Sequence, residues 1–367
     1  MAVLRGDWLT QGPTVPRFEA RLAQLAGVGQ AVVCSSGTAA LHLAMIAAGV
    51  GPGDELVVPA NTFVATAAAG VSLGAKARFA DVDAVTGNVR VTDIECCLNR
   101  ATKAVLPVHF AGYPCDMRAV RQLVRAAAPK ARVIEDACHA LGAQHADGTP
   151  VGWTANSDMV VFSFHPVKHV AMGEGGVVLT DDADLADTMR RARCHGLTKD
   201  RTKLRRPDEG PWYYEMHEPG HNYRATDIAC ALGLAQLEKL DRSVARRRHI
   251  AARYHTELAG LQHTVLPSPF DVALSSWHIY VLHIDFAALG KSRRRVVEEL
   301  AARNVGTQVH YYPVPLQPYY RDRLGHTEGD FPGAEQHYAR ALTIPLFPGL
   351  SDGDVDVVVA SLHEVIQ

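Results

Sequence analysis

The chain has 367 residues, and its 37 lysines and arginines nearly balance its 39 aspartates and glutamates. This length is enough for two packed domains, while a charge near zero gives no field that would attract a nucleic-acid backbone or an anionic membrane, which argues against both partners. The seven cysteines are scattered and form neither a zinc motif nor a disulfide framework, which predicts a cytoplasmic protein without a metal site. The longest apolar run, near 41–50, is too short to cross a bilayer.

Short β-like runs alternate with helical patterns through the first half of the chain. We expect strands at 31–34, 56–59, 77–82, 104–108, 133–136, 159–164 and 177–180. We expect helices at 17–25, 38–48, 117–127 and 185–193. This alternation predicts an α/β domain with a mainly parallel sheet that is covered by helices.

A different pattern follows after residue 198. The polar stretch 199–217 has no clear period, and loops of such length in a compact domain usually have a function. An arginine-rich helical stretch at 226–258 then leads to strands at 277–284 and 305–309, a helix at 292–303 and a last helix at 352–365. We therefore expect a large domain at 1–245 and a smaller α/β domain at 246–367.

Lys168 is the most informative residue, because it follows an apolar strand and precedes the Gly-rich turn 173–176. Ligands bind at the carboxyl edge of open α/β sheets, and a desolvated lysine at that edge has a lowered pKa and becomes a nucleophile that can form a Schiff base. A solvated surface lysine is the ordinary alternative. The chain, however, has only eight lysines among its 37 basic residues.

Three further segments test whether Lys168 belongs to a pyridoxal phosphate site. The turn before Thr38 leads into a helix whose start could bind a phosphate, although it could equally be a simple N-cap. Asp136 ends a short strand, where a carboxylate could keep the cofactor's pyridine nitrogen protonated or could instead form a salt bridge. Phe63 follows a strand end, where it could cover a cofactor ring or be a core residue.

These segments occur in the order phosphate turn, aromatic residue, acid and lysine, each at the end of a β-like run. In this arrangement the chain resembles the DegT/DnrJ/EryC1/StrS sugar aminotransferases, which are fold type I, pyridoxal-phosphate-dependent enzymes. The motifs that carry the resemblance lie at 4–13, 36–42, 135–140, 160–176, 220–227 and 307–320. Several long motifs in one order are more specific than a single glycine-rich loop. The resemblance covers nearly the whole chain.

The resemblance implies a role for each matching residue. Lys168 matches the Schiff-base lysine, which also moves the substrate proton, and Asp136 matches the partner of the pyridine nitrogen. The positions that match the other cofactor-binding residues of the family are Thr38 and Ala39 (phosphate amides), Ser163 (phosphate hydroxyl), Phe63 (ring stacking), His139 (ring face) and Asn222 (phosphate, from the neighbouring subunit). A contact from the neighbouring subunit implies a homodimer with shared active sites.

The resemblance also implies the reaction. Family members usually take the amino group from L-glutamate and pass it to a keto group of a nucleotide-linked sugar. The amino donor and the sugar acceptor occupy the same active site one after the other. Three alternatives remain: a dehydratase branch, which has histidine in place of the lysine; a catalytically silent nucleotide-sugar sensor; and an aminotransferase for another keto sugar or a cyclitol. The presence of Lys168 and Asp136 argues against the first two.

The substrate end of the site is predicted from the segment 307–320. It is most similar to the branch that aminates C4 of a UDP-linked 4-keto-6-deoxy-N-acetylhexosamine, which places His310 and Tyr312 near the sugar nucleotide. The alternative is that His310 and its neighbours form an ordinary strand of the small domain. His221 and Trp277 depart from the aromatic residues that are frequent in the family. The family usually has a further helix before the position of Leu4, so either the start is natively short or residues precede Met1.

Overall fold

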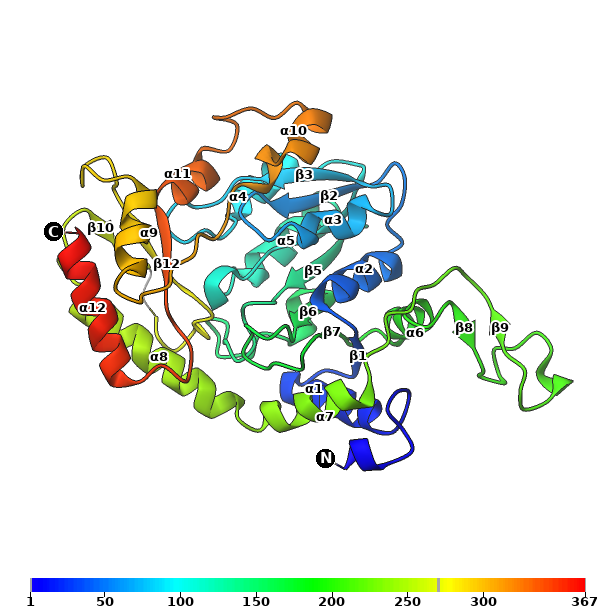
Figure 1. Ribbon diagram of the computed structural model, residues 1–367. Helices are drawn as coiled ribbons and strands as arrows, with labels where there is room; N and C mark the ends of the chain where they lie inside the picture. The colour runs from blue at the N-terminus through cyan, green and yellow to red at the C-terminus, as the bar shows by residue number, and fades with distance from the viewer. Residues whose placement is uncertain (1, 269–270, 367) are drawn as a thin grey trace.

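A seven-stranded sheet forms the centre of the computed structural model, which describes residues 2–268 and 271–366 (Figure 1). The strand order is β1-β7-β6-β5-β4-β2-β3. The strands are β1 Gln30–Cys34, β2 Glu55–Pro59, β3 Lys76–Ala80, β4 Thr102–Val105, β5 Arg132–Asp136, β6 Met159–Ser163 and β7 Gly176–Thr180. Neighbouring strands from β3 to β6 are parallel, and only β7 runs antiparallel to its neighbours β1 and β6. The predicted mainly parallel sheet is confirmed.

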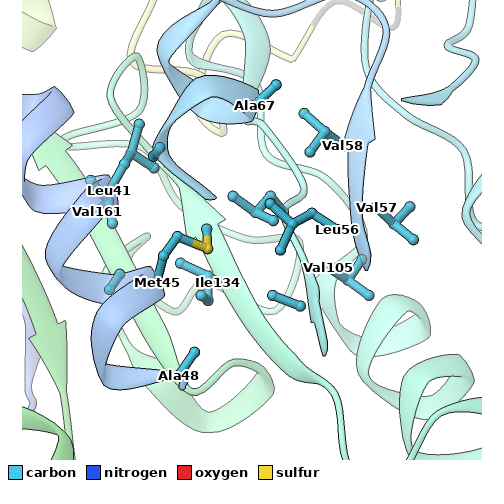
Figure 2. Close-up of a cluster of buried hydrophobic side chains, with 14 of the residues drawn as sticks. Leu41, Met45, Ala48, Leu56, Val57, Val58, Ala67, Val105, Ile134 and Val161 are labelled. Carbon is cyan, nitrogen blue, oxygen red and sulfur yellow. The ribbon is translucent and has the colours of Figure 1, made fainter. Parts of the chain in front are cut away.

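Both faces of this sheet are buried, which explains why its strands are continuous apolar runs rather than alternating ones. In β6, Val161 packs in the core on one face, while Val160 and Phe162 pack in the core on the other. The first core lies under α2 to α6, and the second lies under α1, α7 and the start of α8. Figure 2 shows the first core, with Leu41 and Met45 of α2 directed toward the strands.

Eight helices surround the sheet or lead away from it, within the described residues. They are α1 Thr14–Ala26, α2 Gly37–Ala47, α3 Ala65–Val71, α4 Val91–Cys97, α5 Met117–Ala127, α6 Ala183–Ala192, α7 Asp227–Leu237 and α8 Leu240–Glu257. The short helices α3 and α4 have only seven residues each and were not predicted. A helix this short shows barely two turns of periodicity, so the sequence gives little signal for it.

A second, three-stranded antiparallel sheet has its own core beside the end of α8. Its strands are β10 Thr264–Val265, β11 Tyr280–Ile284 and β12 Ala341–Ile344, and the helices around it are α9 Arg293–Ala301, α11 Pro332–Arg340 and α12 Asp352–Ile366. Figure 1 shows α8 running from the large sheet toward this part of the chain. The short helix α10 Pro318–Leu324 instead packs its Tyr320 in the first core of the large sheet, 5.0 Å from the Phe79 ring.

Helix α8 belongs to both cores. Leu240 and Val244 pack under the large sheet, whereas Ile250 and Tyr254 pack with the small sheet. The expected domain boundary between residues 245 and 246 therefore falls inside one helix, and we propose that the two domains share it. The stretch 226–258, expected to be one helix, is divided into α7 and α8.

The expected strand at 305–309 is wrong. Within 305–309 only Gln308 pairs with another strand, through an isolated bridge to Thr343 of β12. The small sheet is completed by the pairing of β12 with β11. The chain leaves the sheet because the Tyr311 N–H donates to Asn61 Oδ1 at 3.1 Å, in a segment that follows β2. The strand expected from 277 begins only at Tyr280, because Trp277 has a left-handed backbone with φ of 50°.

The polar stretch 199–217 is a hairpin-like arm between β8 Leu197–Thr198 and β9 Glu215–Met216. Figure 1 shows it projecting away from the sheet. The Glu215 carboxylate accepts the N–H groups of Arg205 and Arg206 at 2.8 and 3.0 Å, which fixes the loop locally. Trp212, three residues before β9, is 74% exposed.

Candidate active site

A cavity of about 630 Å³ lies where the parallel strands β5 and β6 end and helix α2 begins. Its volume is in the range of small-molecule sites, and its position at the carboxyl edge is where α/β sheets bind ligands. The residues that line it include seven of the predicted site residues: Thr38, Phe63, Asp136, His139, Ser163, Lys168 and His310. Residues distant in the sequence thus meet in one cavity.

Lys168 lies in the loop between β6 and β7. Its backbone N–H donates to His165 O at 2.8 Å, and its Nζ lies 3.3 Å from His278 Nε2. Burial lowers the pKa of the lysine, and the nearby Cys138 and Asp136 oppose that effect. A buried amine with a lowered pKa is more often uncharged, and only the uncharged amine is a nucleophile.

Asp136 is the last residue of β5, and its carboxylate is held from two sides. Oδ2 accepts the hydroxyl of Thr66 at 2.7 Å, and Oδ1 accepts the backbone N–H of Cys138 at 3.2 Å. The Thr66 hydroxyl in turn contacts Thr62 Oγ1 at 2.8 Å. The carboxylate is therefore buried, oriented and directed into the cavity, in place of forming the salt bridge that was the alternative.

The start of α2 forms another side of the cavity. Ser36 caps the helix by accepting the Ala39 N–H at 3.0 Å, so this amide already has an acceptor, whereas Thr38 lines the cavity. A Cβ atom on Gly37 would lie 2.8 Å from Ser163 Cβ, so glycine permits the close approach of α2 to the end of β6. The positive end of the α2 dipole and the Ser163 hydroxyl consequently face the same space.

Aromatic and histidine side chains form the opposite side. The Tyr311 hydroxyl lies 3.3 Å from His139 Nε2, and the Phe63 ring, 56% exposed, lies 6.2 Å from the Tyr311 ring. Burial is the main cause of the lowered pKa of His139, and it also lowers the pKa of His310 to about 4. Both imidazoles are neutral near pH 7 and offer hydrogen bonds without adding charge.

Three predicted residues are not among those that line this cavity in the described chain: Ala39, whose N–H is bonded to Ser36, and Asn222 and Tyr312. Asn222 is exposed and pairs as an isolated bridge with Cys194. Tyr312 does not line the cavity; its ring lies 5.1 Å from Tyr338, and Tyr311 takes the lining position. A contact from Asn222 to a ligand would have to be made in another copy of the chain.

These features fit pyridoxal 5′-phosphate. The helix start and Ser163 suit a phosphate, Asp136 suits a protonated pyridine nitrogen, and Lys168 is an amine in the same cavity. The Nδ1 atom of His139 is buried and has no partner in the described residues, so this side of the cavity retains an unused polar group.

Comparison with known proteins decides the family. Residues 1–363 match the DegT/DnrJ/EryC1/StrS aminotransferase family. The chain belongs to this family. The aminotransferase is thus an enzyme, its fold is the predicted fold type I, and its cofactor is pyridoxal 5′-phosphate, as predicted.

Relatives of the aminotransferase extend over the same length. It is 40% identical to the spore coat polysaccharide biosynthesis protein SpsC of Bacillus subtilis, over 99% of this chain and 92% of that protein. Helicobacter pylori PseC, an aminotransferase involved in the biosynthesis of pseudoaminic acid, has a TM-score of 0.90 at 27% identity, covering 100% and 94% of the two chains. The sugar aminotransferase CalS13 of Micromonospora echinospora has a TM-score of 0.87 at 29% identity, covering 99% and 95%.

Three residues of the site escaped the sequence analysis. Thr66 lies on the short helix α3, Tyr311 was expected near the substrate only as one of the tyrosines beside His310, and His278 lies inside the strand expected at 277–284. Their only sequence signal is a polar residue within an apolar context, which is too common to be specific.

Within residues 2–268 and 271–366, no helix is long and apolar enough to cross a membrane, and no three His, Cys, Asp or Glu side chains are grouped so that they could hold a metal ion.

Proposed function

We propose that the aminotransferase transfers an amino group from L-glutamate to a keto group of a nucleotide-linked deoxy sugar, and that C4 of a UDP-linked 4-keto-6-deoxy-N-acetylhexosamine is the acceptor. The single observation that carries the proposal is the Lys168 amine and the Asp136 carboxylate in one cavity of a DegT/DnrJ/EryC1/StrS chain. The sugar class is supported by the similarity to PseC and CalS13.

The roles of the residues follow from their positions. When bound, pyridoxal phosphate accepts the electron pair that is released as a substrate C–H bond breaks. Lys168 would hold the cofactor covalently between turnovers and, once displaced, would take up the substrate proton at Nζ and deliver it to a different carbon. Asp136 keeps the ring nitrogen protonated, and the Thr66 hydroxyl fixes the carboxylate for that role.

The phosphate and ring contacts complete the cofactor site. Thr38 and Ser163 would hold the phosphate at the start of α2, where the helix dipole favours an anion. Ala39 would share its amide between the phosphate and Ser36. Phe63 would cover one face of the ring, and the neutral His139 would contact the ring face or its substituents.

The part of the cavity where the sugar would bind is lined by different residues from the part where the cofactor would bind. His310 and Tyr311 lie on the cavity wall that comes from the small-sheet part of the chain. His310 Nδ1 is 2.8 Å from Thr343 Oγ1, which orients the ring. A neutral imidazole and an aromatic ring suit a sugar whose hydroxyls need hydrogen bonds and whose C6 methyl is apolar.

An amine-transfer assay tests the substrate. Glutamate is offered with a panel of UDP- and dTDP-linked 4-keto and 3-keto deoxy sugars and with a keto cyclitol, and products are identified by mass spectrometry and NMR. We expect a 4-amino product from the UDP-linked 4-keto-6-deoxy-N-acetylhexosamine. Turnover of a 3-keto sugar or the cyclitol alone would reject this substrate and keep the aminotransferase, whereas glutamate unable to aminate the bound cofactor would reject the donor.

The exposed position of Asn222 is the reason for the second part of the proposal, a homodimer whose sites are shared. Exposed apolar side chains in and near the arm, including Trp212, Tyr214 and Met216, suit burial against a second copy. Lys168→Ala and Asn222→Ala proteins are unfolded together, refolded and assayed. Half of the dimers should be mixed and have one intact site of two, which restores about a quarter of the wild-type activity. No recovery from dimers that do exchange subunits would contradict a shared site.

A further inference from the structure

The amine of Lys168 has a neighbour that belongs to the other half of the molecule. Its Nζ lies 3.3 Å from Nε2 of His278, which precedes β11 of the small sheet and is 110 residues away in the sequence. His278 is 6% exposed, and its ring lies 4.3 Å from the His139 ring. The contact therefore joins the reactive loop of the large sheet to the small sheet.

The backbone around His278 is held on both sides. The buried Arg247 of α8 donates to the carbonyls of Trp277, His278 and Leu346 at 2.8–3.1 Å. The His278 N–H donates to Ala111 O at 3.0 Å. An imidazole on such a fixed backbone has little freedom to turn away from the lysine.

Ser276, two residues before His278, also fixes the position of this segment. Ser276 donates its hydroxyl to His139 O at 3.0 Å, and its own carbonyl lies 3.1 Å from Nε2 of His169, the residue directly after Lys168. The segment 276–278 is therefore bonded to the residues after Asp136 and to the residue after Lys168. Its position is set by the two loops that carry the reactive groups.

The chemistry of the contact depends on the charge of the lysine. A protonated lysine has three N–H groups and no lone pair, so it can only donate, and a neutral imidazole can accept at Nε2. An uncharged lysine can also donate through one N–H and keep its lone pair directed elsewhere. In both states the hydrogen bond selects one orientation of the amine.

We infer, on the basis of the proposed role of Lys168, that His278 is the positioning residue of this lysine. His278 Nε2 accepts a hydrogen bond from Nζ whenever the amine is free. This bond holds the amine in place while the amine carries the substrate proton. The proton that leaves the substrate carbon forms a new N–H bond on Nζ, and that N–H bond breaks when Nζ delivers the proton to a different carbon, as transamination requires. His278 gains and loses no proton in the cycle.

The surroundings keep the proton on the lysine. The charged or titratable groups that influence Lys168 or His278 are Asp136, Cys138, His139, His169, His310 and Arg247. Burial, and then the neighbouring His139 and Lys168, lower the pKa of His278 well below its ordinary value. A base this weak accepts a hydrogen bond from an ammonium without removing its proton.

The test compares His278→Gln with His278→Met. Both side chains are unbranched and similar in length, but only glutamine offers a strong acceptor near the Nε2 position. The rate at which acetic anhydride labels Lys168 in the cofactor-free protein is measured against pH by peptide mapping, which gives the pKa of this one amine. Loss of the acceptor should lower that pKa by about one unit in the methionine variant, while the glutamine variant should stay within about 0.3 of wild type.

The control is His283→Met, which removes another buried small-sheet histidine; its Nε2 lies 3.1 Å from His337 Nδ1. It should leave the pKa of Lys168 unchanged. If His278→Met does not fold, His278→Ala takes its place in the same measurement. An unchanged pKa in the acceptor-free variant, or an equal shift in the glutamine variant or the control, would overturn the inference. Because the labelling needs neither cofactor nor substrate, it is independent of whether the proposed sugar is correct.

Discussion

The two walls of the cavity are built in different ways. The strand-end wall, which consists of Asp136, Ser163 and Lys168, follows directly from the parallel strands β5 and β6. The small-sheet wall, which we define as the lining residues His310 and Tyr311 together with His278, which contacts Lys168 Nζ but does not line the cavity, comes from irregular segments on either side of the small sheet. The first wall supplies charged and nucleophilic groups, and the second supplies neutral imidazoles and a phenol.

This difference separates chemistry from selectivity. A strand that is bonded to neighbours along its length fixes the residue at its end, so the reactive groups occupy set positions. Irregular segments can change without disturbing the large sheet, which suits residues that distinguish one substrate from another. We therefore expect substitutions on the strand-end wall to abolish turnover and those on the small-sheet wall to alter selectivity.

The largest effect is expected for Lys168→Ala. Removal of the amine should lower kcat by at least about 10³-fold, because both the covalent attachment and the proton transfer are lost. Steady-state kinetics measures this, with Lys199→Ala, an exposed arm lysine, as the control. Borohydride reduction and peptide mapping should place the phosphopyridoxyl group on Lys168 in the wild type, and its presence on any other lysine would end the assignment.

The buried histidines of the small-sheet wall, together with His283 and His337 nearby, should make folding sensitive to acid. The pKa values of His278, His283, His310 and His337 are all lowered by burial, to about 3 for His283 and about 4 for His310. Below pH 6.5 the unfolded chain binds protons that the folded chain does not, so the free energy of unfolding falls as the pH falls toward 4. Each such histidine contributes a slope of about 1.4 kcal/mol per pH unit.

Urea unfolding at pH 7.5, 6.5 and 5.5 checks this dependence. The free energy of unfolding should fall by about 1 kcal/mol between the two higher values and by at least about 3 kcal/mol between the two lower ones. His283→Gln should reduce the slope by the contribution of one proton. A free energy that is constant down to pH 5.5 would show that these imidazoles are protonated in the folded protein.

A smaller effect is expected for Thr66→Val, which removes the 2.7 Å hydrogen bond to Asp136 on the strand-end wall. One uncompensated bond to a buried carboxylate should lower kcat about tenfold. Thr180→Val is the matched control, because Thr180 is also fully buried and bonded, to Asp158 O at 2.8 Å, but lies on β7 away from the cavity. Equal kinetics in the two variants would mean that Asp136 needs no help from Thr66.

The smallest effect is expected for His310→Gln on the small-sheet wall. The kcat/KM for the sugar should fall by about fivefold or less, while cofactor affinity and the glutamate half-reaction stay unchanged. Tyr312→Phe, outside the cavity, should leave all three values as they are. A loss of cofactor from His310→Gln would show that the two walls are not separate in function.

The sequence predicted the strand-end wall well because its signals are local. A run of apolar residues, then a strand end, then Asp136 or Lys168, is visible within ten residues, and the seven strands of the large sheet were all expected near their observed places. Family membership, fold and cofactor followed from these motifs and are confirmed by the match over residues 1–363. The individual site residues remain predictions that the experiments above test.

The small-sheet wall could not be predicted in the same way because its contacts are distant in the sequence. The expected strand at 305–309 ignored the bond from Tyr311 to Asn61, which joins residues 250 positions apart and draws the segment to the cavity. The partner of Lys168 is 110 residues away, and nothing in the local pattern around His278 indicates it. Tertiary bonds of this kind override local propensity.

The reversed direction of β7 has a consequence for where the chain can be altered. Because β6 and β7 are antiparallel neighbours, the loop that carries Lys168 starts and ends at adjacent positions, and the bonds from Phe164 N to Gly175 O and from Met172 N to Phe164 O close it further. Extra residues there would displace the lysine or the residues beside it that line the cavity, such as His165 and Val167. The arm between β8 and β9 projects away from the cavity. We therefore expect the protein to tolerate an inserted tag or a proteolytic cut in the arm, and to tolerate neither in the lysine loop.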